Sequence, residues 1–187
     1  DDELDFDIES FNRQVITENF NRTVLAEIAR DIDPESPEEQ GKTLIYAVDD
    51  QHADMIVSIL KEIYSETGVD NDAIMKITGS VGGGNKKKVQ EAIKRFKNER
   101  YPSIVVTVDL LTTGIDVPEI TTLVFMRRVK SRILFEQMLG RATRLCPEIH
   151  KTHFEIYDPV GVYDSLEPVN TMKPVVTDPN TTFMQLI

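Results

Sequence analysis

The 187-residue sequence contains a single cysteine, Cys146. One cysteine excludes an internal disulfide framework and favours a reducing compartment, so we expect the chain in the cytoplasm. No apolar run approaches the ~18 residues that a bilayer-spanning helix needs, and the start of the chain lacks the charged, apolar and small-residue succession of a signal peptide. The composition therefore predicts a chain with no membrane partner.

A complete phosphate-binding loop is also missing. The glycine- and lysine-rich stretch ITGSVGGGNKKK, residues 77–88, invites comparison with the Walker pattern G-x-x-x-x-G-K-[ST]. Gly79 and Gly84 have the right spacing, but Asn85 replaces the lysine and Lys86 replaces the hydroxyl. The pattern fails at both positions that would hold phosphate and magnesium, which leaves turn flexibility or a direct ligand contact as roles for the glycines.

Negative charge is concentrated at the N-terminus. Residues 1–40 carry 13 Asp or Glu against 3 Arg, whereas the net charge of the whole chain is −11, so the remainder is nearly neutral. Basic residues gather in 86–100 and again in 127–144. These two segments are either local surfaces for a polyanion or ordinary solvated helix faces.

Hydrophobic periodicity divides the chain into three parts. Apolar residues recur at helical spacing from Phe11 to Ile32, and DPESPEE then interrupts the pattern with two prolines, so 1–40 is predicted to be an acidic helix followed by a linker. Residues 41–160 alternate apolar runs with helical segments. Residues 161–187 are proline-rich with little periodicity, which predicts a tail or a link to a following region.

Five apolar runs in the middle part predict a doubly wound α/β sheet. The runs are TLIYAV (43–48), AIMKIT (73–78), SIVVTV (103–108), TTLVFM (121–126) and THFEIYD (152–158). The second and third are nearly continuous in apolar residues, as in strands covered on both faces. Strands interleaved with helices predict a mainly parallel sheet with right-handed crossovers. Ligands bind such sheets beyond the carboxyl ends of the strands, which is where ITGSVGGGNKKK would lie.

A second basic segment, SRILFEQMLGRATR, has a helical pattern. If it is helical, Gln137, Arg141 and Arg144 share one face, and Gly140 lets that face approach a neighbour closely. Two guanidinium groups on such a face suit a phosphoryl group whose charge is spread over its oxygens. The alternative is a basic helix that forms salt bridges with acidic neighbours.

Together, TVDLLTTGIDVPE and QMLGRATR resemble motifs V and VI of superfamily 2 helicases and translocases, and LIYAVDDQHAD (44–54) resembles motif IV. The longer run SRILFEQMLGRATRLCPEIHKTHFEIYDPVGVYDSLEPV and the lead-in FNRQVITENFNR are similar to the restriction (R) subunit of type I restriction-modification enzymes, an ATP-driven DNA translocase and nuclease of prokaryotes. The resemblance implies the second RecA-like domain of the motor.

The resemblance also implies roles for individual residues on the nucleotide side. Arg141 and Arg144 would meet the ATP phosphates from across a cleft, with one or both acting as an arginine finger. Gln137 would help to position the nucleotide, and Asp116 would bind its ribose or link to the arginines. Asp116 has a simpler alternative, since it precedes Val117 and Pro118 and can order a turn.

On the DNA side, the resemblance implies that Thr78, Gly79 and Thr107 touch the backbone. Thr107 has the alternative of a satisfied hydroxyl at a strand end. Thr113 and Gly114 would shape the turn between the two ligands, the first assigned to nucleic acid and the second to the nucleotide. The three consecutive lysines Lys86, Lys87 and Lys88 are placed at a helix start, where a polyanion backbone can pass.

Several features of a complete restriction motor are absent from this sequence. It has no Walker A lysine and no Walker B acids, which hold ATP and Mg²⁺ in the first motor domain, and it contains no Glu-x-Lys of the expected nuclease. The resemblance therefore implies a domain that is inactive alone. Its expected partners are double-stranded DNA, the first RecA-like and nuclease domains of the same polypeptide, and the modification and specificity subunits.

Two alternatives stay open: a non-catalytic RecA-like binding module, or the corresponding domain of another superfamily 2 DNA helicase. No metal site is expected. Cys146, His150 and His153 lack a fourth ligand and flank Pro147. Asp49 and Asp50 follow a predicted strand and precede a helix, where carboxylates cap N–H groups and interact well with the helix dipole.

Overall fold

The computed structural model describes residues 10, 12–13, 16–109, 117–128 and 155–160. In this part of the chain, five strands form one sheet in the order β2-β3-β1-β4-β5, and every neighbouring pair is parallel. The strands are β1 (Lys42–Tyr46), β2 (Ile74–Lys76), β3 (Ile104–Thr107), β4 (Ile120–Phe125) and β5 (Glu155–Tyr157). The five predicted strands and their parallel arrangement are confirmed.

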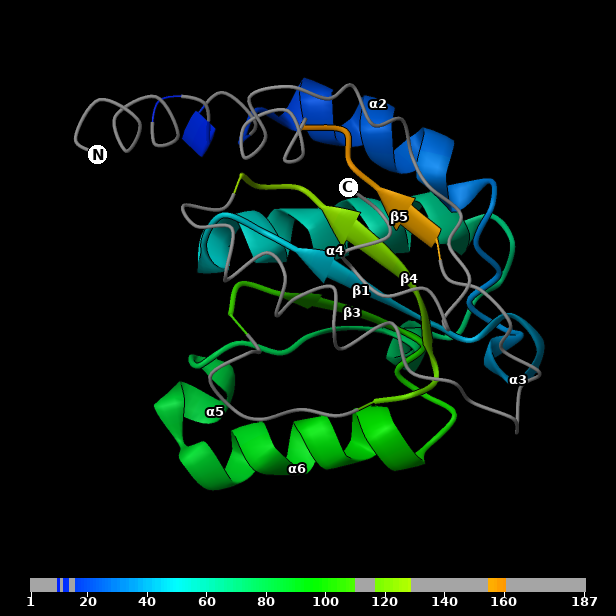
Figure 1. Cartoon of the computed structure of the whole chain (residues 1–187), viewed down its shortest axis with the longest axis vertical. Helices are drawn as coiled ribbons and strands as arrows, with labels where there is room; N and C mark the ends of the chain where they lie inside the picture. Colours follow the sequence, from blue (N-terminus) through cyan, green and yellow to red (C-terminus); the bar gives the residue numbers. More distant parts are fainter. Residues whose placement is uncertain (1–9, 11, 14–15, 110–116, 129–154, 161–187) are drawn as a thin grey trace, which may run out of the picture.

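Helices cover both faces of the sheet, as a doubly wound fold requires. Helices α2 (Glu18–Ala29) and α4 (Asp50–Ser65) lie on one face, and α6 (Lys86–Asn98) lies on the other (Figure 1). Three short helical turns complete the described elements: α3 (Pro37–Gln40), η1 (Asn71–Ala73) and α5 (Val81–Gly84).

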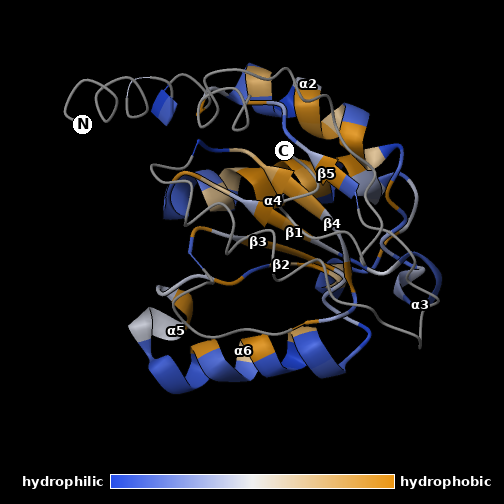
Figure 2. Cartoon of the chain, viewed as in Figure 1, coloured by the Kyte–Doolittle hydropathy of each residue, from blue (hydrophilic) through white to orange (hydrophobic). Residues whose placement is uncertain are grey.

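Side-chain alternation explains why the sheet is covered on both faces. In β1, Leu44 and Tyr46 pack in the apolar cluster that contains Phe96 of α6, whereas Ile45 packs in the cluster that contains Ile56 of α4. Both faces of the strand are thus apolar, as expected for a central parallel strand. The hydropathy colouring shows the same division, with apolar strands between amphipathic helices (Figure 2).

The N-terminal helix packs on α4 and contributes Leu25 and Ile28 to the same core as that helix. Its pattern predicts a helix as far as Ile32, but the observed helix ends at Ala29. A buried polar contact joins the two helices, because the fully buried His52 contacts Asn21 through Nε2 at 2.8 Å. The Nδ1 atom of His52 accepts from the backbone N–H of Val48 at 3.0 Å.

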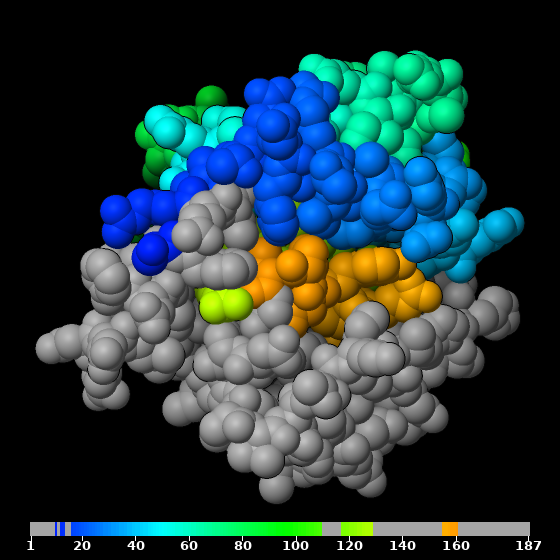
Figure 3. All heavy atoms as spheres, turned by 90° about the horizontal axis from the view of Figure 1, so that it is seen from above, coloured from blue at the N-terminus to red at the C-terminus, as the bar shows by residue number. Residues whose placement is uncertain are grey.

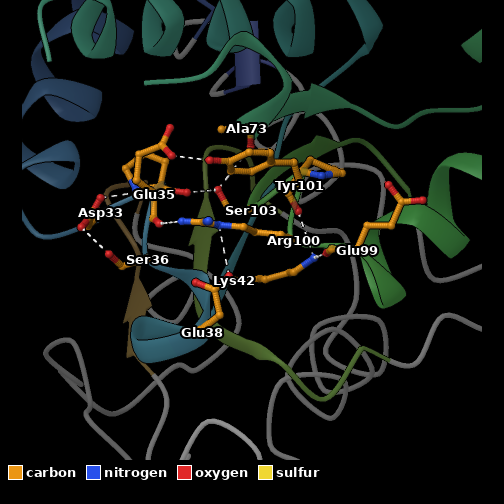
Figure 4. A network of polar contacts seen from close by, with 12 residues as sticks. Asp33, Glu35, Ser36, Glu38, Lys42, Ala73, Glu99, Arg100, Tyr101 and Ser103 are labelled. Carbon is orange, nitrogen blue, oxygen red and sulfur yellow. Dashed lines mark hydrogen bonds and ion pairs between the residues drawn. The ribbon is translucent and has the colours of Figure 1, made fainter. Parts of the chain in front are cut away.

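The amino ends of the strands are held by polar contacts that close the fold (Figure 4). The buried Lys42 donates through Nζ to the carbonyl oxygens of Phe96 and Glu99, both at 2.5 Å, and of Pro102 at 3.1 Å. These acceptors lie at and beyond the end of α6, where a cation is favourable. Burial lowers the pKa of Lys42 to about 8. The polar groups at the amino ends of the strands therefore have a structural role.

The linker before β1 is attached at this same edge. Tyr101 donates its hydroxyl to the Glu35 carboxylate, and Arg100 donates to the Glu35 carbonyl oxygen. Ser103 donates to the carbonyl oxygen of Pro34 at 2.7 Å. Figure 4 shows these side chains converging from the linker and from the segment before β3.

Candidate nucleic-acid interface

The carboxyl ends of the strands lie together at the opposite edge, because all pairs are parallel. Strand β1 is central, with β3 on one side and β4 on the other. The connection that follows β1 leads to β2 on one side of the sheet, and the connection that follows β3 leads to β4 on the other side. Ligands of doubly wound sheets bind at such switch points. The described candidates Thr78, Gly79 and 86–88 follow β2, and Thr107 ends β3, so the structure brings them all to this edge.

The turn after β2 is attached to the start of α4 by one carboxylate. Asp50 accepts from the hydroxyls of Thr78 at 2.5 Å and Ser80 at 2.6 Å, and from Lys76 Nζ at 3.0 Å. Hydrogen bonds from Ser80, Thr78 and Lys76 lower the pKa of Asp50 to about 2. The carboxylate is therefore ionised at neutral pH and holds two hydroxyls and an ammonium at once.

Thr78 is expected to touch the DNA backbone, yet its side chain is largely committed within the protein. The residue is 6% exposed, and its hydroxyl oxygen also lies 2.9 Å from Ser80 Oγ. The described geometry gives Thr78 a role in shaping the turn. A DNA contact by Thr78 stays a prediction, as does the one assigned to its neighbour Gly79.

The three consecutive glycines adopt a conformation that side chains disfavour. Gly82, Gly83 and Gly84 have φ of 62°, 72° and 81°, which L-residues rarely adopt. At Gly82 a Cβ would also lie 2.3 Å from Cδ of Lys88. These exposed glycines form a turn, and the left-handed backbone explains why glycine occupies the three positions; turn flexibility and a direct ligand contact both stay predictions.

Lys86, Lys87 and Lys88 form the first turn of α6, and we call them the lysine triplet. All three are exposed, and none makes an ion pair with a described residue. Asn85 caps the helix by accepting from the N–H of Lys87 at 2.9 Å, and the first turn contains no acid. Cations at a helix N-terminus oppose the dipole, so their positive charge is not explained by helix stability.

Thr107 ends β3 and is fully buried. Its Oγ1 has no hydrogen-bond partner among the described residues, so the alternative of a satisfied strand-end hydroxyl finds no support there. Nearby, Arg127 reaches across the edge to the carbonyl oxygen of Val108 at 3.5 Å. Burial lowers the pKa of Arg127, and Asp109 opposes that shift.

The remaining candidates lie outside the described residues. These candidates are Thr113, Gly114, Asp116, Gln137, Arg141 and Arg144, together with the discounted Cys146, His150 and His153. The structure thus places the described DNA-side candidates at one edge of the sheet, and both the DNA-side and the nucleotide-side assignments stay predictions. In the described ranges, no group of three or more potential metal ligands occurs, and no helix is long and apolar enough to cross a bilayer.

The sequence suggested that both Asp49 and Asp50 cap the helix, but in the structure the two carboxylates have different partners. Asp49 caps α4 as expected, accepting from the N–H of His52 at 2.7 Å. Asp50 instead turns toward residues 76–80, a contact that sequence reasoning missed. No local signal was available for it, since Thr78 and Ser80 are 28 and 30 positions away.

A cavity of about 350 Å³ lies between α2 and the end of β5. Figure 3 shows these two segments side by side at the surface. The cavity contains none of the predicted site residues. Its lining residues are Thr23, Val24, Glu27, Ile28, Tyr157, Asp158 and Pro159.

The doubly wound parallel sheet, with polar turns at its carboxyl edge, places the chain among RecA-like α/β domains. A family model of the helicase conserved C-terminal domain matches residues 22–146. The chain belongs to that family.

Named relatives agree with this assignment. The chain is 48% identical, over 100% of its length, to the Type I restriction enzyme EcoKI endonuclease subunit of Escherichia coli K12, and 29% identical over 84% to the EcoAI endonuclease subunit. A solved fragment assigned to the HsdR subunit of a type I restriction enzyme from Vibrio vulnificus YJ016 superposes with a TM-score of 0.68 at 27% identity, covering 90% of this chain.

All three relatives are much longer than this chain. The chain spans 16% of the EcoKI subunit, 19% of the EcoAI subunit and 31% of the Vibrio chain. The C-terminal part of the Fun30 ATPase domain shares the fold alone, with a TM-score of 0.52 at 16% identity over 73% of this chain.

Proposed function

We propose that this chain is the second motor domain of the restriction subunit of a type I restriction endonuclease, a prokaryotic cytoplasmic enzyme that translocates duplex DNA with ATP and cleaves it. The observation that carries the proposal is the 48% identity to the EcoKI endonuclease subunit along the whole chain. A non-catalytic binding module has no physical need for the Gln137, Arg141 and Arg144 pattern.

On the DNA side, the domain contributes backbone contacts. The lysine triplet supports this part of the proposal, because it is exposed, lacks an ion-pair partner among described residues and lies at the carboxyl edge. Lysines contact phosphates by charge and carry no base information. Such contacts suit an enzyme that moves along DNA regardless of its sequence.

On the nucleotide side, Arg141 and Arg144 act on the ATP phosphates, and Gln137, Asp116 and Gly114 help to bind the nucleotide. The first motor domain of the same polypeptide supplies the phosphate loop and the Mg²⁺ ligands, and ATP is bound between the two domains. The nuclease domain and the modification and specificity subunits complete the enzyme. Developing phosphoryl charge is what an arginine finger stabilises.

The test compares the isolated chain with the intact restriction subunit. The 187-residue chain should hydrolyse no ATP above background, since the phosphate loop is elsewhere. In the intact subunit, Arg141→Ala or Arg144→Ala should lower the ATPase turnover by about 10³ or more. Arg30→Ala is the matched control, because Arg30 is exposed and pairs only with Glu27 among described residues.

Each result decides a separate part of the proposal. ATP turnover by the isolated chain that disappears in Arg144→Ala would refute the division of the site between two domains. Unchanged ATP turnover in both variants of the intact subunit would favour the alternative, in which Arg141 and Arg144 form salt bridges with acidic neighbours. Loss of turnover in Arg30→Ala as well would show that the assay reports folding.

A further inference from the structure

The geometry points to Asp50 as a positioning residue that holds the turn 78–80, and through it the lysine triplet, in the orientation that meets the DNA backbone. This inference rests on the proposed function. Asp50 lies at the start of α4 and is neither one of the predicted DNA contacts nor one of the predicted nucleotide contacts.

The Asp50 carboxylate is free to act on this turn because its neighbour caps the helix. Asp49 accepts from the His52 N–H, so α4 does not need a second cap. Both oxygens of Asp50 face the end of β2 and the turn that follows it: Oδ1 accepts from the Thr78 and Ser80 hydroxyls, and Oδ2 accepts from Lys76. Charge-assisted hydrogen bonds of 2.5 to 2.6 Å are at the strong end of the range for hydroxyl donors.

A short chain of backbone contacts links this turn to the lysine triplet. Val81 N–H donates to the Thr78 carbonyl at 3.2 Å, and Gly83 and Gly84 donate to the Ser80 carbonyl at 3.0 and 3.2 Å. The close approach of Gly82 to the Lys88 side chain continues the link to the triplet. We therefore expect a displacement of Ser80 to shift the start of α6.

The charge balance of the turn suits an anionic partner. Asp50 would repel DNA phosphates if it were unpaired, but Lys76 lies 3.0 Å from it and 2.7 Å from Asp54. The two acids and Lys76 leave one net negative charge in this small group. The lysine triplet outweighs that charge and has no ion pair among the described residues.

The charge effect and the positioning effect of changing Asp50 have opposite signs. Asp50→Asn and Asp54→Asn each remove one negative charge near the interface, so simple electrostatics predicts equal or tighter DNA binding in both. Positioning predicts weaker binding in Asp50→Asn alone, because the amide presents a donor to Lys76 and lacks the charge that holds two hydroxyls. Asp54 touches Lys76 but neither hydroxyl in the described contacts, which makes it a matched control.

The experiment measures duplex-DNA affinity of the intact subunit against salt concentration, together with ATP affinity without DNA. We expect Asp50→Asn to weaken DNA binding several-fold and to flatten the salt slope by about 0.9 for each phosphate that the protein no longer neutralises. Asp54→Asn should bind DNA at least as tightly as wild type. ATP affinity should be unchanged in both variants.

A second pair of variants keeps the test decisive if Asp50→Asn does not fold. Ser80→Ala removes one hydroxyl partner of Asp50, and Ser80→Thr keeps it. The first should weaken DNA binding and the second should retain most of it. Equal DNA affinity in these two variants would overturn the positioning role.

The outcomes also separate this inference from the proposed function. If Asp50→Asn binds DNA as tightly as Asp54→Asn while removal of the lysine triplet weakens binding, Asp50 has no positioning role and the interface stands. If removal of the triplet has no effect on binding or its salt slope, the interface at this turn is wrong, and the inference fails with it.

Discussion

Replacing Lys86, Lys87 and Lys88 with alanine in the intact subunit should weaken DNA binding without destabilising the domain. All three side chains are exposed and lack an ion pair among described residues, so truncation breaks no described salt bridge. They also lie in the first turn of α6, where each cation opposes the dipole by about 0.3 to 1 kcal/mol at low salt. We therefore expect an unchanged or slightly raised thermal midpoint together with weaker binding.

The magnitude follows from counterion release. Each neutralised phosphate contributes about 0.9 to the slope of log affinity against log salt, so removing three lysine–phosphate pairs flattens it by about 2.7. Between 50 and 200 mM salt, a fourfold change, the ratio of wild-type to variant affinity should therefore shrink by about 40-fold. The effect should be the same for duplexes of any sequence, because phosphate contacts read no bases.

The assay is equilibrium binding to two unrelated duplexes over this salt range, with thermal unfolding of the same samples. Lys94 and Lys97, exposed on the same helix but toward its other end, provide the control when both are changed to alanine. Parallel salt curves for wild type and the triplet variant would refute the phosphate contacts. An equal loss of DNA affinity in the Lys94 and Lys97 variant would show that the effect comes from overall charge and not from contacts made by the lysine triplet. A selective loss of ATP affinity would revive the phosphate-loop interpretation of ITGSVGGGNKKK.

Two further predictions concern stability. Burial lowers the pKa of His52 to about 4 from its ordinary value of 6.5, so the unfolded chain binds a proton that the folded chain does not, and stability is lost as pH falls from 6.5 to 4. The loss totals about 3 kcal/mol of unfolding free energy. Urea unfolding at pH 7, 6 and 5 should show that this free energy falls less steeply with pH in His52→Gln than in wild type. Equal slopes in the two proteins would contradict the lowered pKa of His52. Gly83→Ala should destabilise the domain by about 1 to 2 kcal/mol through its φ of 72°. Gly79→Ala should not destabilise the domain, because φ of Gly79 is not positive and a Cβ there meets nothing within 4 Å. Similar unfolding midpoints for the two variants would show that the turn relaxes around the Gly83→Ala substitution.

Much of the fold was readable from the sequence because the strands are apolar on both faces. Runs such as SIVVTV mark strands wherever they pair, and the helical spacing between them implies crossovers that make the sheet parallel. The start of α6 at Lys86, Lys87 and Lys88 was also expected from the sequence, and the structure adds that Asn85 caps it through its own side chain. These signals are local, so each strand or helix can be predicted from its own segment of the sequence.

The candidate site was only partly predictable. Parallel strands put every following turn at one edge, so the position of the lysine triplet at the carboxyl edge follows from fold class alone. The left-handed backbone of Gly82, Gly83 and Gly84 does not, because glycine permits that conformation without requiring it. The nucleotide-side residues, Arg141 and Arg144 among them, stay predictions from motif resemblance.

Hydrophobic spacing and capping act within a few residues, so local sequence is enough to assign the strands and helices. Which strands are neighbours, and therefore which polar groups meet, follows from the packing of the whole chain. Lys42 reaches the end of α6, 54 positions away at Phe96, and Asp50 reaches Thr78 across the edge of the sheet. Each contact depends on the path of the whole chain, since a carboxylate or ammonium group satisfies its hydrogen bonds with whichever partners the packed core brings within reach.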